Sequence, residues 1–201
     1  MNRTFLYETH LSLNAKLVNF SGWEMPINYG SQIREHNEVR NNIGIFDVSH
    51  MTIIDCKGPR VRDFLRRVLA NDVGSLATNH ALYSVLLNER GGVVDDLIVY
   101  RLPDCYRLVT NAATKDKVLA WLDLQNLEQI QLEELDVSMI AIQGPRSLQA
   151  IGRWSKAYDF ESLKPFSCVL IDEVLVARTG YTGEDGFELI AVSYTHLRAH
   201  E

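Results

Sequence analysis

Residues 81–102 read ALYSVLLNERGGVVDDLIVYRL, and this stretch decides the fold that the sequence predicts. Two runs rich in β-branched and aromatic residues, 81–87 and 93–102, flank a short polar segment. The paired glycines at the end of that segment, Gly91 and Gly92, can supply the positive φ that a hairpin turn needs. We therefore expect an antiparallel hairpin at this point of the chain.

Helices and further strands are predicted on both sides of the hairpin. A strand at 52–54 precedes a helix that opens at Pro59. The apolar residues of this helix recur at helical spacing, at Val61, Phe64, Leu65, Val68 and Leu69. After the hairpin we expect a strand at 106–109, a helix at 114–124 and a strand at 130–135. The order strand, helix, hairpin, strand, helix, strand is close to a ferredoxin-like α+β unit.

The outer parts of the chain predict more elements of both kinds. A helix is expected to be capped at Ser31 and to end at Gly44. A later helix is expected to have Pro145 at its first position. Strands are expected at 139–142, 169–171 and 174–177.

The composition is that of a soluble globular protein, with 46% hydrophobic and 23% charged residues among 201. No apolar run approaches the ~20 residues that a membrane helix requires, and the N-terminus lacks the apolar core of a secretory signal. A cytoplasmic protein without a membrane partner is therefore expected. The net charge of −6 argues against binding to nucleic acid, because such proteins need a positive field.

Four arginines crowd one predicted helix and are the local exception to this acidic balance. Either a solvated helix face or a contact with an acidic partner is consistent with them. They are Arg60, Arg62, Arg66 and Arg67.

Neither a disulfide framework nor a metal site is predicted. Cys56, Cys105 and Cys168 are widely spaced and form no C-x-x-C pair, so they are expected to be core residues in a reducing compartment. The histidines are scattered without the spacing of metal ligands, and we expect no metal.

An Asp-Asp pair interrupts the second strand of the hairpin, at Asp95 and Asp96. Carboxylates are disfavoured in strand interiors and costly to bury without a partner. Because side chains alternate across a strand, the two must face opposite ways. Both faces of the strand are apolar, so periodicity does not choose between them. It also leaves open whether either aspartate is functional or structural.

The segment 180–186, with glycines at both ends, predicts a tight turn that leads into another strand. It lacks both G-x-G-x-x-G and the lysine of a phosphate loop, so a plain hairpin turn competes with a ligand-binding loop. Glu188 and Tyr181 suggest a ligand, because a carboxylate accepts paired N–H bonds from a flat heterocycle and a tyrosine packs on its face.

The segment 46–51 reads FDVSHM and places Asp47, Ser49 and His50 close together in the chain. These residue types suggest a hydrolase triad. Chain neighbours rarely point at one another, however, and no G-x-S-x-G elbow is present. A hydrolase is therefore disfavoured.

Several motifs taken together resemble the glycine cleavage T-protein family in their order and spacing. They are FSGWEMP at 20–26, FDVSHM at 46–51, GGVVDDLIVY at 91–100, QGP at 143–145 and RTGYTGEDGFEL at 178–189. No single motif is specific, but the set in register is, and it covers nearly all of residues 1–190.

The resemblance implies an α+β protein with a discontinuous domain and an inserted one. Residues 1–50 and 137–191 would form an antiparallel-sheet, folate-binding domain, and residues 51–136 a ferredoxin-like domain. The C-terminal β-barrel domain of the family is expected to be absent from this chain. Residues 192–201 match nothing in the family and are expected to be a foreign tail, an artefact joined to a truncated gene.

The resemblance also implies an activity. The family transfers the methylene of an aminomethyl group, carried on the lipoyl arm of the H-protein, to tetrahydrofolate and releases ammonia. By correspondence Asp96 is the catalytic residue, because a fixed carboxylate stabilises the cation that develops as ammonia leaves. The residues expected to line the folate cavity are Met51, Tyr83, Asp96, Asn111, Tyr181 and Glu188. The truncated chain by itself is expected to be nearly inactive.

Other functions on the same fold stay open at this point. Folate-dependent demethylases of methylated glycines or sulfonium compounds are the nearest alternative, together with a folate-binding repair protein. A non-catalytic folate-binding module is an alternative of a different class.

Overall fold

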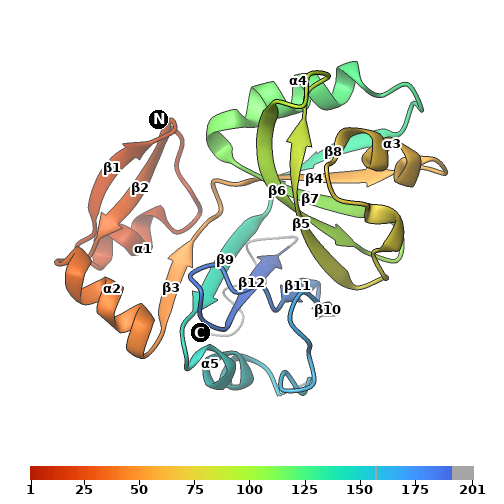
Figure 1. Cartoon of the computed structure of the whole chain (residues 1–201). Coiled ribbons are helices and arrows are strands. Elements are labelled where there is room, and N and C mark those ends of the chain that lie inside the picture. The colour runs from red at the N-terminus through yellow and green to blue at the C-terminus, as the bar shows by residue number, and fades with distance from the viewer. Residues whose placement is uncertain (157, 192–201) are drawn as a thin grey trace. The chain divides into compact units, whose positions relative to one another are not determined.

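The structure is a computed structural model that describes residues 1–156 and 158–191, and it contains two compact units (Figure 1). Met1–His50 and the chain from Val137 onward form unit 1, and Met51–Asp136 form unit 2. Both units combine helices with antiparallel sheets, which confirms the α+β fold class.

Unit 2 is built on a five-stranded antiparallel sheet with the strand order β5-β6-β7-β4-β8. Its strands are β4 (Thr52–Lys57), β5 (His80–Leu87), β6 (Val93–Arg101), β7 (Tyr106–Thr110) and β8 (Gln131–Leu135). Its helices are α3 (Val61–Val68) and α4 (Lys115–Leu124), with short 3-10 turns η1 (Val73–Ser75) and η2 (Ala112–Thr114). The sheet has one strand more than a β-α-β-β-α-β unit, because β7 follows the hairpin before α4 begins.

The predicted hairpin is β5 and β6, which pair in antiparallel register with Tyr83 opposite Ile98. Gly91 takes a positive φ of 74° in the turn. The side chain of Asn88 closes the turn by accepting hydrogen bonds from the backbone N–H groups of Arg90 and Gly92, both at 2.9 Å. The hydrogen bonds of the Asn88 side chain and the positive φ of Gly91 thus determine the shape of this turn.

Both helices of unit 2 pack on one face of its sheet and share a core with it. Phe64 and Leu65 of α3 and Leu122 of α4 are fully buried in this core together with Leu108 of β7. The helix predicted to open at Pro59 begins slightly later, because its N-cap is Arg60. Its apolar stripe is nevertheless the predicted one, with Phe64, Leu65 and Val68 buried.

Unit 1 is built on a second five-stranded antiparallel sheet, with the strand order β10-β11-β12-β9-β3, and on a separate hairpin, β1-β2. The sheet strands are β3 (Gly44–Asp47), β9 (Ser138–Gln143), β10 (Cys168–Ile171), β11 (Val174–Ala177) and β12 (Gly186–Ala191). The hairpin strands are β1 (Lys16–Phe20) and β2 (Trp23–Asn28), and the helices are α1 (Tyr7–Ser12), α2 (Gln32–Asn41) and α5 (Ser147–Trp154).

The predicted start of α2 is confirmed, but its predicted end at Gly44 is wrong. Ser31 caps the helix by accepting a hydrogen bond from the N–H of Arg34, and the helix ends at Asn41. Gly44 instead opens β3, where a Cβ would lie 2.5 Å from the side chain of Val39. The glycine allows the strand to pass close to the helix that precedes it.

The helix expected from Pro145 onward is α5, whose N-cap is Arg146, so the proline precedes the helix rather than occupying its first position. Ile151 is fully buried and packs in a core with Val176 of β11 and Phe187 of β12. Gly144 joins β9 to α5 with a φ of 126°.

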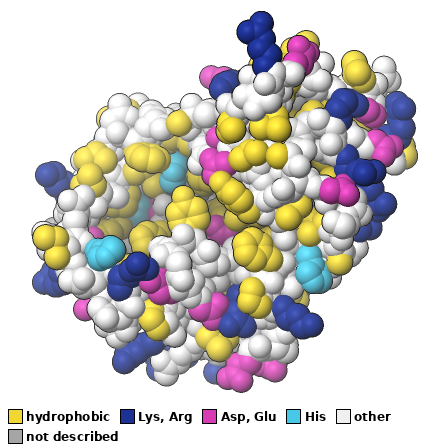
Figure 2. Space-filling view, viewed as in Figure 1, with side chains coloured by type: hydrophobic (Ala, Val, Ile, Leu, Met, Phe, Trp, Pro, Cys, Tyr) yellow, Lys and Arg dark blue, Asp and Glu magenta, His cyan; other side chains and the backbone are white. Residues whose placement is uncertain are grey.

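Charged side chains of both signs are interspersed on the face drawn in Figure 2. The arginines near α3 follow the same pattern. Arg66 forms an ion pair with Asp72 at 2.8 Å, and Arg67 pairs with Glu128. Part of this basic cluster is thus neutralised within unit 2.

Among residues 1–156 and 158–191, none of the helices combines the length and hydropathy that a bilayer crossing requires.

Candidate functional site

The Asp-Asp pair lies in β6, and strand alternation separates its members as predicted. Asp95 is 6% exposed, whereas Asp96 is exposed to solvent. Exposure by itself does not distinguish a functional Asp96 from an ordinary solvent-facing aspartate.

The carboxylate of Asp96 is instead held by donors from two neighbouring strands. The Tyr83 hydroxyl, on β5, donates to Oδ2 at 3.0 Å. The side-chain amide of Asn111, which follows β7, donates to Oδ1 at 3.0 Å and to the Asp96 backbone carbonyl at 3.2 Å. The structure therefore brings together three of the residues predicted to line one cavity. The arrangement can present a fixed negative charge at the surface of unit 2.

Asn111 also binds the buried member of the pair. Its backbone N–H donates to Asp95 Oδ2 at 3.0 Å and its side-chain amide to Asp95 Oδ1 at 2.9 Å. The family resemblance gives Asp95 no role, and only the unusual Asp-Asp sequence marks it.

Met51, another residue predicted to line the cavity, is the first residue of unit 2 and is partly buried. It precedes β4, whose partner strand β7 leads to Asn111. Its predicted contact with folate stays a prediction.

The predicted turn at 180–186 lies in unit 1 and is held from several directions. Gln143 of β9 accepts from the backbone N–H of Tyr181 at 2.9 Å and donates to the carbonyl of Thr179 at 3.2 Å. Arg178 forms a two-point ion pair with Asp185, at 2.9 and 2.6 Å. The backbone around Tyr181 is therefore tied to the sheet.

A second tie connects this turn to helix α2. Arg40 donates to the backbone carbonyl of Thr182 at 3.0 Å and pairs with the carboxylate of Glu184. Gly180 must be a glycine here, because a Cβ would lie 2.3 Å from the backbone carbonyl oxygen of Glu184. These contacts hold the backbone of the turn in a defined place.

The two side chains predicted to contact a ligand from this turn differ in exposure. Tyr181 is 79% exposed, and Glu188 on β12 is 6% exposed. The hydroxyl of Thr179 donates to Glu188 Oε2 at 2.5 Å. An exposed aromatic ring and a buried, hydrogen-bonded carboxylate are groups suited to a flat heterocycle with N–H donors.

The disfavoured hydrolase triad is not assembled in unit 1. The Ser49 hydroxyl donates to the backbone carbonyl of Met139 at 3.2 Å, and it accepts from the Met139 N–H at 3.1 Å. The buried Nδ1 of His50 has no hydrogen-bond partner among the described residues. Ser49 therefore ties the end of β3 to β9.

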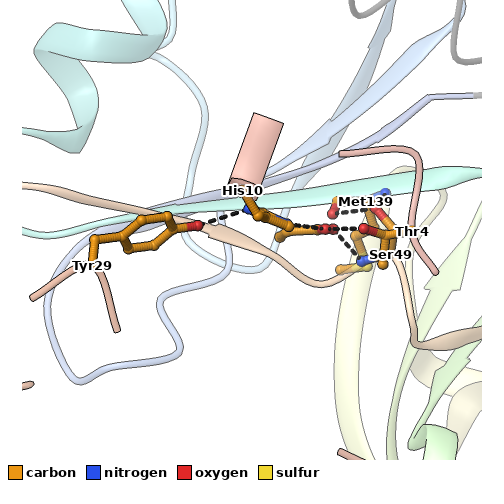
Figure 3. Close-up of polar contacts among 6 residues, drawn as sticks. Thr4, His10, Tyr29, Ser49 and Met139 are labelled. Carbon is orange, nitrogen blue, oxygen red and sulfur yellow. Dashed lines mark hydrogen bonds and ion pairs between the residues drawn. The ribbon is translucent and has the colours of Figure 1, made fainter. Parts of the chain in front are cut away.

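The partner of Asp47 is a different histidine, which the sequence motifs did not indicate (Figure 3). His10 is 4% exposed, and its Nε2 lies 2.8 Å from Asp47 Oδ2. Thr4 donates to the same oxygen at 2.5 Å, and the hydroxyl of Tyr29 lies 2.8 Å from His10 Nδ1. The contact joins residues 37 positions apart, which local spacing does not reveal.

Charge effects indicate a structural role for this network. Burial by itself raises the pKa of Asp47, but hydrogen bonds from Thr4, His10 and Ser49 outweigh burial and hold that pKa below its ordinary value. Burial, with the charges of Asp47 and Glu35, raises the pKa of the Tyr29 phenol. The hydrogen bonds of Thr4 and His10 to Asp47, and that of Tyr29 to His10, join separate segments of Met1–His50, which is a structural role.

Comparison with known proteins places the whole arrangement in a family. The GCVT N-terminal domain family matches residues 6–199. The match enters 192–201, which lie outside the described residues, so the expectation that this tail is foreign stays a prediction.

Relatives with a known activity are similar over most of the chain. An aminomethyltransferase from Francisella tularensis subsp. tularensis is 48% identical over 196 residues, which are 94% of this chain and 55% of the relative. One from Alcanivorax borkumensis is 47% identical over 94% of this chain and 54% of its own length. The chain thus spans about half the length of these curated relatives.

Solved structures agree with the sequence comparison. The glycine cleavage system aminomethyltransferase T from Bartonella henselae has a TM-score of 0.90 at 33% identity, over 98% of this chain and 56% of that chain. A heterotetrameric sarcosine oxidase from Corynebacterium sp. U-96 has a TM-score of 0.50 at 17% identity and resembles it in fold alone. The family match over most of its length and the agreement in fold show that the chain belongs to the GCVT N-terminal domain family.

Proposed function

We propose that this chain is part of an aminomethyltransferase that acts on tetrahydrofolate, with Asp96 as its catalytic residue. The proposed site also uses Met51, Tyr83, Asn111, Tyr181 and Glu188. The observation that carries the proposal is the exposed Asp96 carboxylate held by the Tyr83 hydroxyl and the Asn111 amide.

In the proposed reaction an aminomethyl group arrives on the lipoyl arm of an H-protein. Its methylene joins N5 and N10 of tetrahydrofolate as the carbon–sulfur and carbon–nitrogen bonds break. One of the two N–H protons of the folate goes to the sulfur, which becomes a dihydrolipoyl thiol. The other goes to the amine, which leaves as ammonia. We place this chemistry in the cytoplasm and require no metal for it.

The proposed role of Asp96 is electrostatic and follows from its fixed position. Positive charge develops on the transferred carbon as ammonia leaves, and a carboxylate already in place stabilises that charge without reorganisation. The same carboxylate can accept a proton from a folate nitrogen, and positioned acid–base catalysis contributes about 10² to 10⁴ in rate. Tyr83 and Asn111 supply the orientation, because each donates to one of its two oxygens.

The carboxylate and the aromatic ring described in unit 1 fit a pterin. A carboxylate such as Glu188 can accept paired N–H bonds from the amino and amide edge of the ring. Tyr181, largely exposed on a rigid turn, can pack against the ring face. Thr179 orients Glu188 through its hydroxyl.

The substitution Asp96→Asn in a full-length protein carrying this sequence tests the proposal. It keeps the shape of the side chain and removes its charge. Turnover to methylenetetrahydrofolate should fall by about 10² to 10⁴, while affinity for tetrahydrofolate changes little. Initial rates and equilibrium binding measure the two quantities. Unchanged turnover in the folded variant would contradict the role of Asp96, and a wild-type protein that binds folate without turnover would indicate a binding module.

A further inference from the structure

Asn111 contacts both members of the Asp-Asp pair, although the two carboxylates leave β6 on opposite faces. Its side-chain nitrogen lies 2.9 Å from Asp95 Oδ1 and 3.0 Å from Asp96 Oδ1. Its backbone N–H adds a bond of 3.0 Å to Asp95 Oδ2. One amide thus connects a buried carboxylate to an exposed one.

The strand register explains how the amide reaches both sides. Thr110, the last residue of β7, lies opposite Leu97, so Asn111 continues to the level of Asp96 just after the ladder ends. The Asp95 carboxylate accepts the backbone N–H that the ladder leaves without a strand partner. Asn111 is therefore held just beyond the end of β7, where its side chain can reach both carboxylates.

Asp95 also favours one orientation of the Asn111 amide. A carboxylate only accepts hydrogen bonds, so the nitrogen of the amide must face it and the oxygen must turn away. Asp95 is 6% exposed, and its buried carboxylate would lose one of the two hydrogen bonds that Asn111 donates to it if the amide turned around. The orientation that satisfies Asp95 is the one in which the nitrogen also donates to Asp96.

We propose that Asp95 is a positioning residue: it fixes the amide of Asn111, and that amide in turn fixes the catalytic carboxylate of Asp96. This inference rests on the proposed function of Asp96. The Asn111 side-chain oxygen then faces away from both carboxylates, which suits it to accept an N–H from the bound substrate.

The orientation itself can be tested without any activity. In the ¹⁵N-labelled chain, the Asn111 side-chain NH₂ should exchange slowly with water, and its two proton shifts should differ from those of a free asparagine amide. Asp95→Ala should accelerate that exchange and move the two shifts toward the values of a free amide. Thr114→Val is the control, because it removes only the bond of 3.1 Å to the Asn111 backbone carbonyl and should leave both the exchange rate and the shifts unchanged. Unchanged Asn111 side-chain signals in Asp95→Ala would overturn the proposal.

A double-mutant cycle tests the link to catalysis in the full-length protein. Asp95→Ala alone should lower kcat by up to about 10²-fold, the cost of a misplaced catalytic group. Added to Asp96→Asn, it should lower kcat no further, because the group that it positions is already lost. Independent, multiplicative losses would overturn the positioning role and indicate a general structural one.

Far-UV circular dichroism and thermal unfolding will show whether Asp95→Ala folds. If it does not, the isosteric variant Asp95→Asn replaces it in the double-mutant cycle. It retains an acceptor oxygen for one of the two Asn111 donors, so it should rescue part of the kcat lost in Asp95→Ala. Full turnover in Asp96→Asn would show separately that the proposed function of Asp96 is wrong. Whether or not that function holds, the Asn111 side-chain signals report whether Asp95 positions the amide.

Discussion

Asp47 shows how several hydrogen-bond donors maintain a buried charge. The Thr4 hydroxyl, the His10 ring and the Ser49 backbone N–H approach its carboxylate at 2.5, 2.8 and 3.0 Å. Hydrogen bonds to the charged form favour it, and here they exceed the opposing effect of burial. Because these donors come from separate segments of Met1–His50, the carboxylate joins the N-terminal segment to the end of β3.

The lowered pKa of Asp47 predicts an acid-sensitive contribution to stability. The native state binds this proton more weakly than the unfolded chain, so the contribution is complete above the ordinary pKa of 3.8 and is lost as pH falls through the lower native value. Asp47→Asn should reduce stability at neutral pH by about 1–3 kcal/mol and flatten the acid dependence below that pKa.

Urea unfolding of the Asp47→Asn variant at a series of pH values measures both effects. Tyr29→Phe is the control, since it removes the hydroxyl at the far end of the network without touching the carboxylate. Equal slopes in acid for wild type and Asp47→Asn would contradict this account.

Short connections between elements place strong demands on particular glycines. At the junction of β9 and α5, Gly144 has a φ of 126°, and a Cβ there would lie 2.6 Å from the carbonyl oxygen of Asn42 and 2.7 Å from that of Val39. Both obstacles are backbone atoms, which yield little. Gly152 within α5 has open space around its Cβ position.

The two glycines therefore predict opposite effects of the same substitution. Gly144→Ala should destabilise the chain by at least about 1–3 kcal/mol, because it combines backbone strain with a clash. Gly152→Ala should stabilise it by about 0.5–1 kcal/mol, because alanine favours a helix interior. Urea unfolding of both variants provides the measurement, and a neutral Gly144→Ala would show that the junction can relax.

Elements with strong local patterns could be predicted from the sequence, and weakly patterned ones could not. The β5-β6 hairpin has two long runs rich in strand-forming residues and a glycine turn, and α3 has a clear apolar stripe. By contrast, α1 has only six residues, and β1 has no buried residue, so neither shows the periodicity of a packed element. Within the candidate site, Asp96 and Asn111 were linked by family resemblance, whereas the contact of Asp47 with His10 depends on the folded chain.

Each of the two units has a hydrophobic core among its described residues. Phe64 is fully buried in a core of unit 2, and Phe187 is fully buried in a core of unit 1. Each unit also has its own five-stranded sheet, and within residues 1–156 and 158–191 every ladder pairs strands of the same unit. Local opening of one core therefore need not open the other.

Truncating each phenylalanine tests this independence. Phe64→Ala should cost about 3–5 kcal/mol and should accelerate amide hydrogen exchange in β7 more than in β11. Phe187→Ala should show the opposite preference at similar cost. Native-state hydrogen exchange of both variants measures this, and equal acceleration in both sheets would show that the chain opens as one cooperative body.

The Asp96 carboxylate is proposed to belong to a site for reduced folate. Its aspartate carboxyl ¹³C resonance, followed in a full-length protein carrying this sequence while tetrahydrofolate is added, tests that proposal. We predict that the Asp96 signal moves with saturation, whereas that of Asp55, paired with Arg107 at 2.7 Å, does not. An Asp96 signal that stays in place while the protein is saturated with tetrahydrofolate would contradict the account.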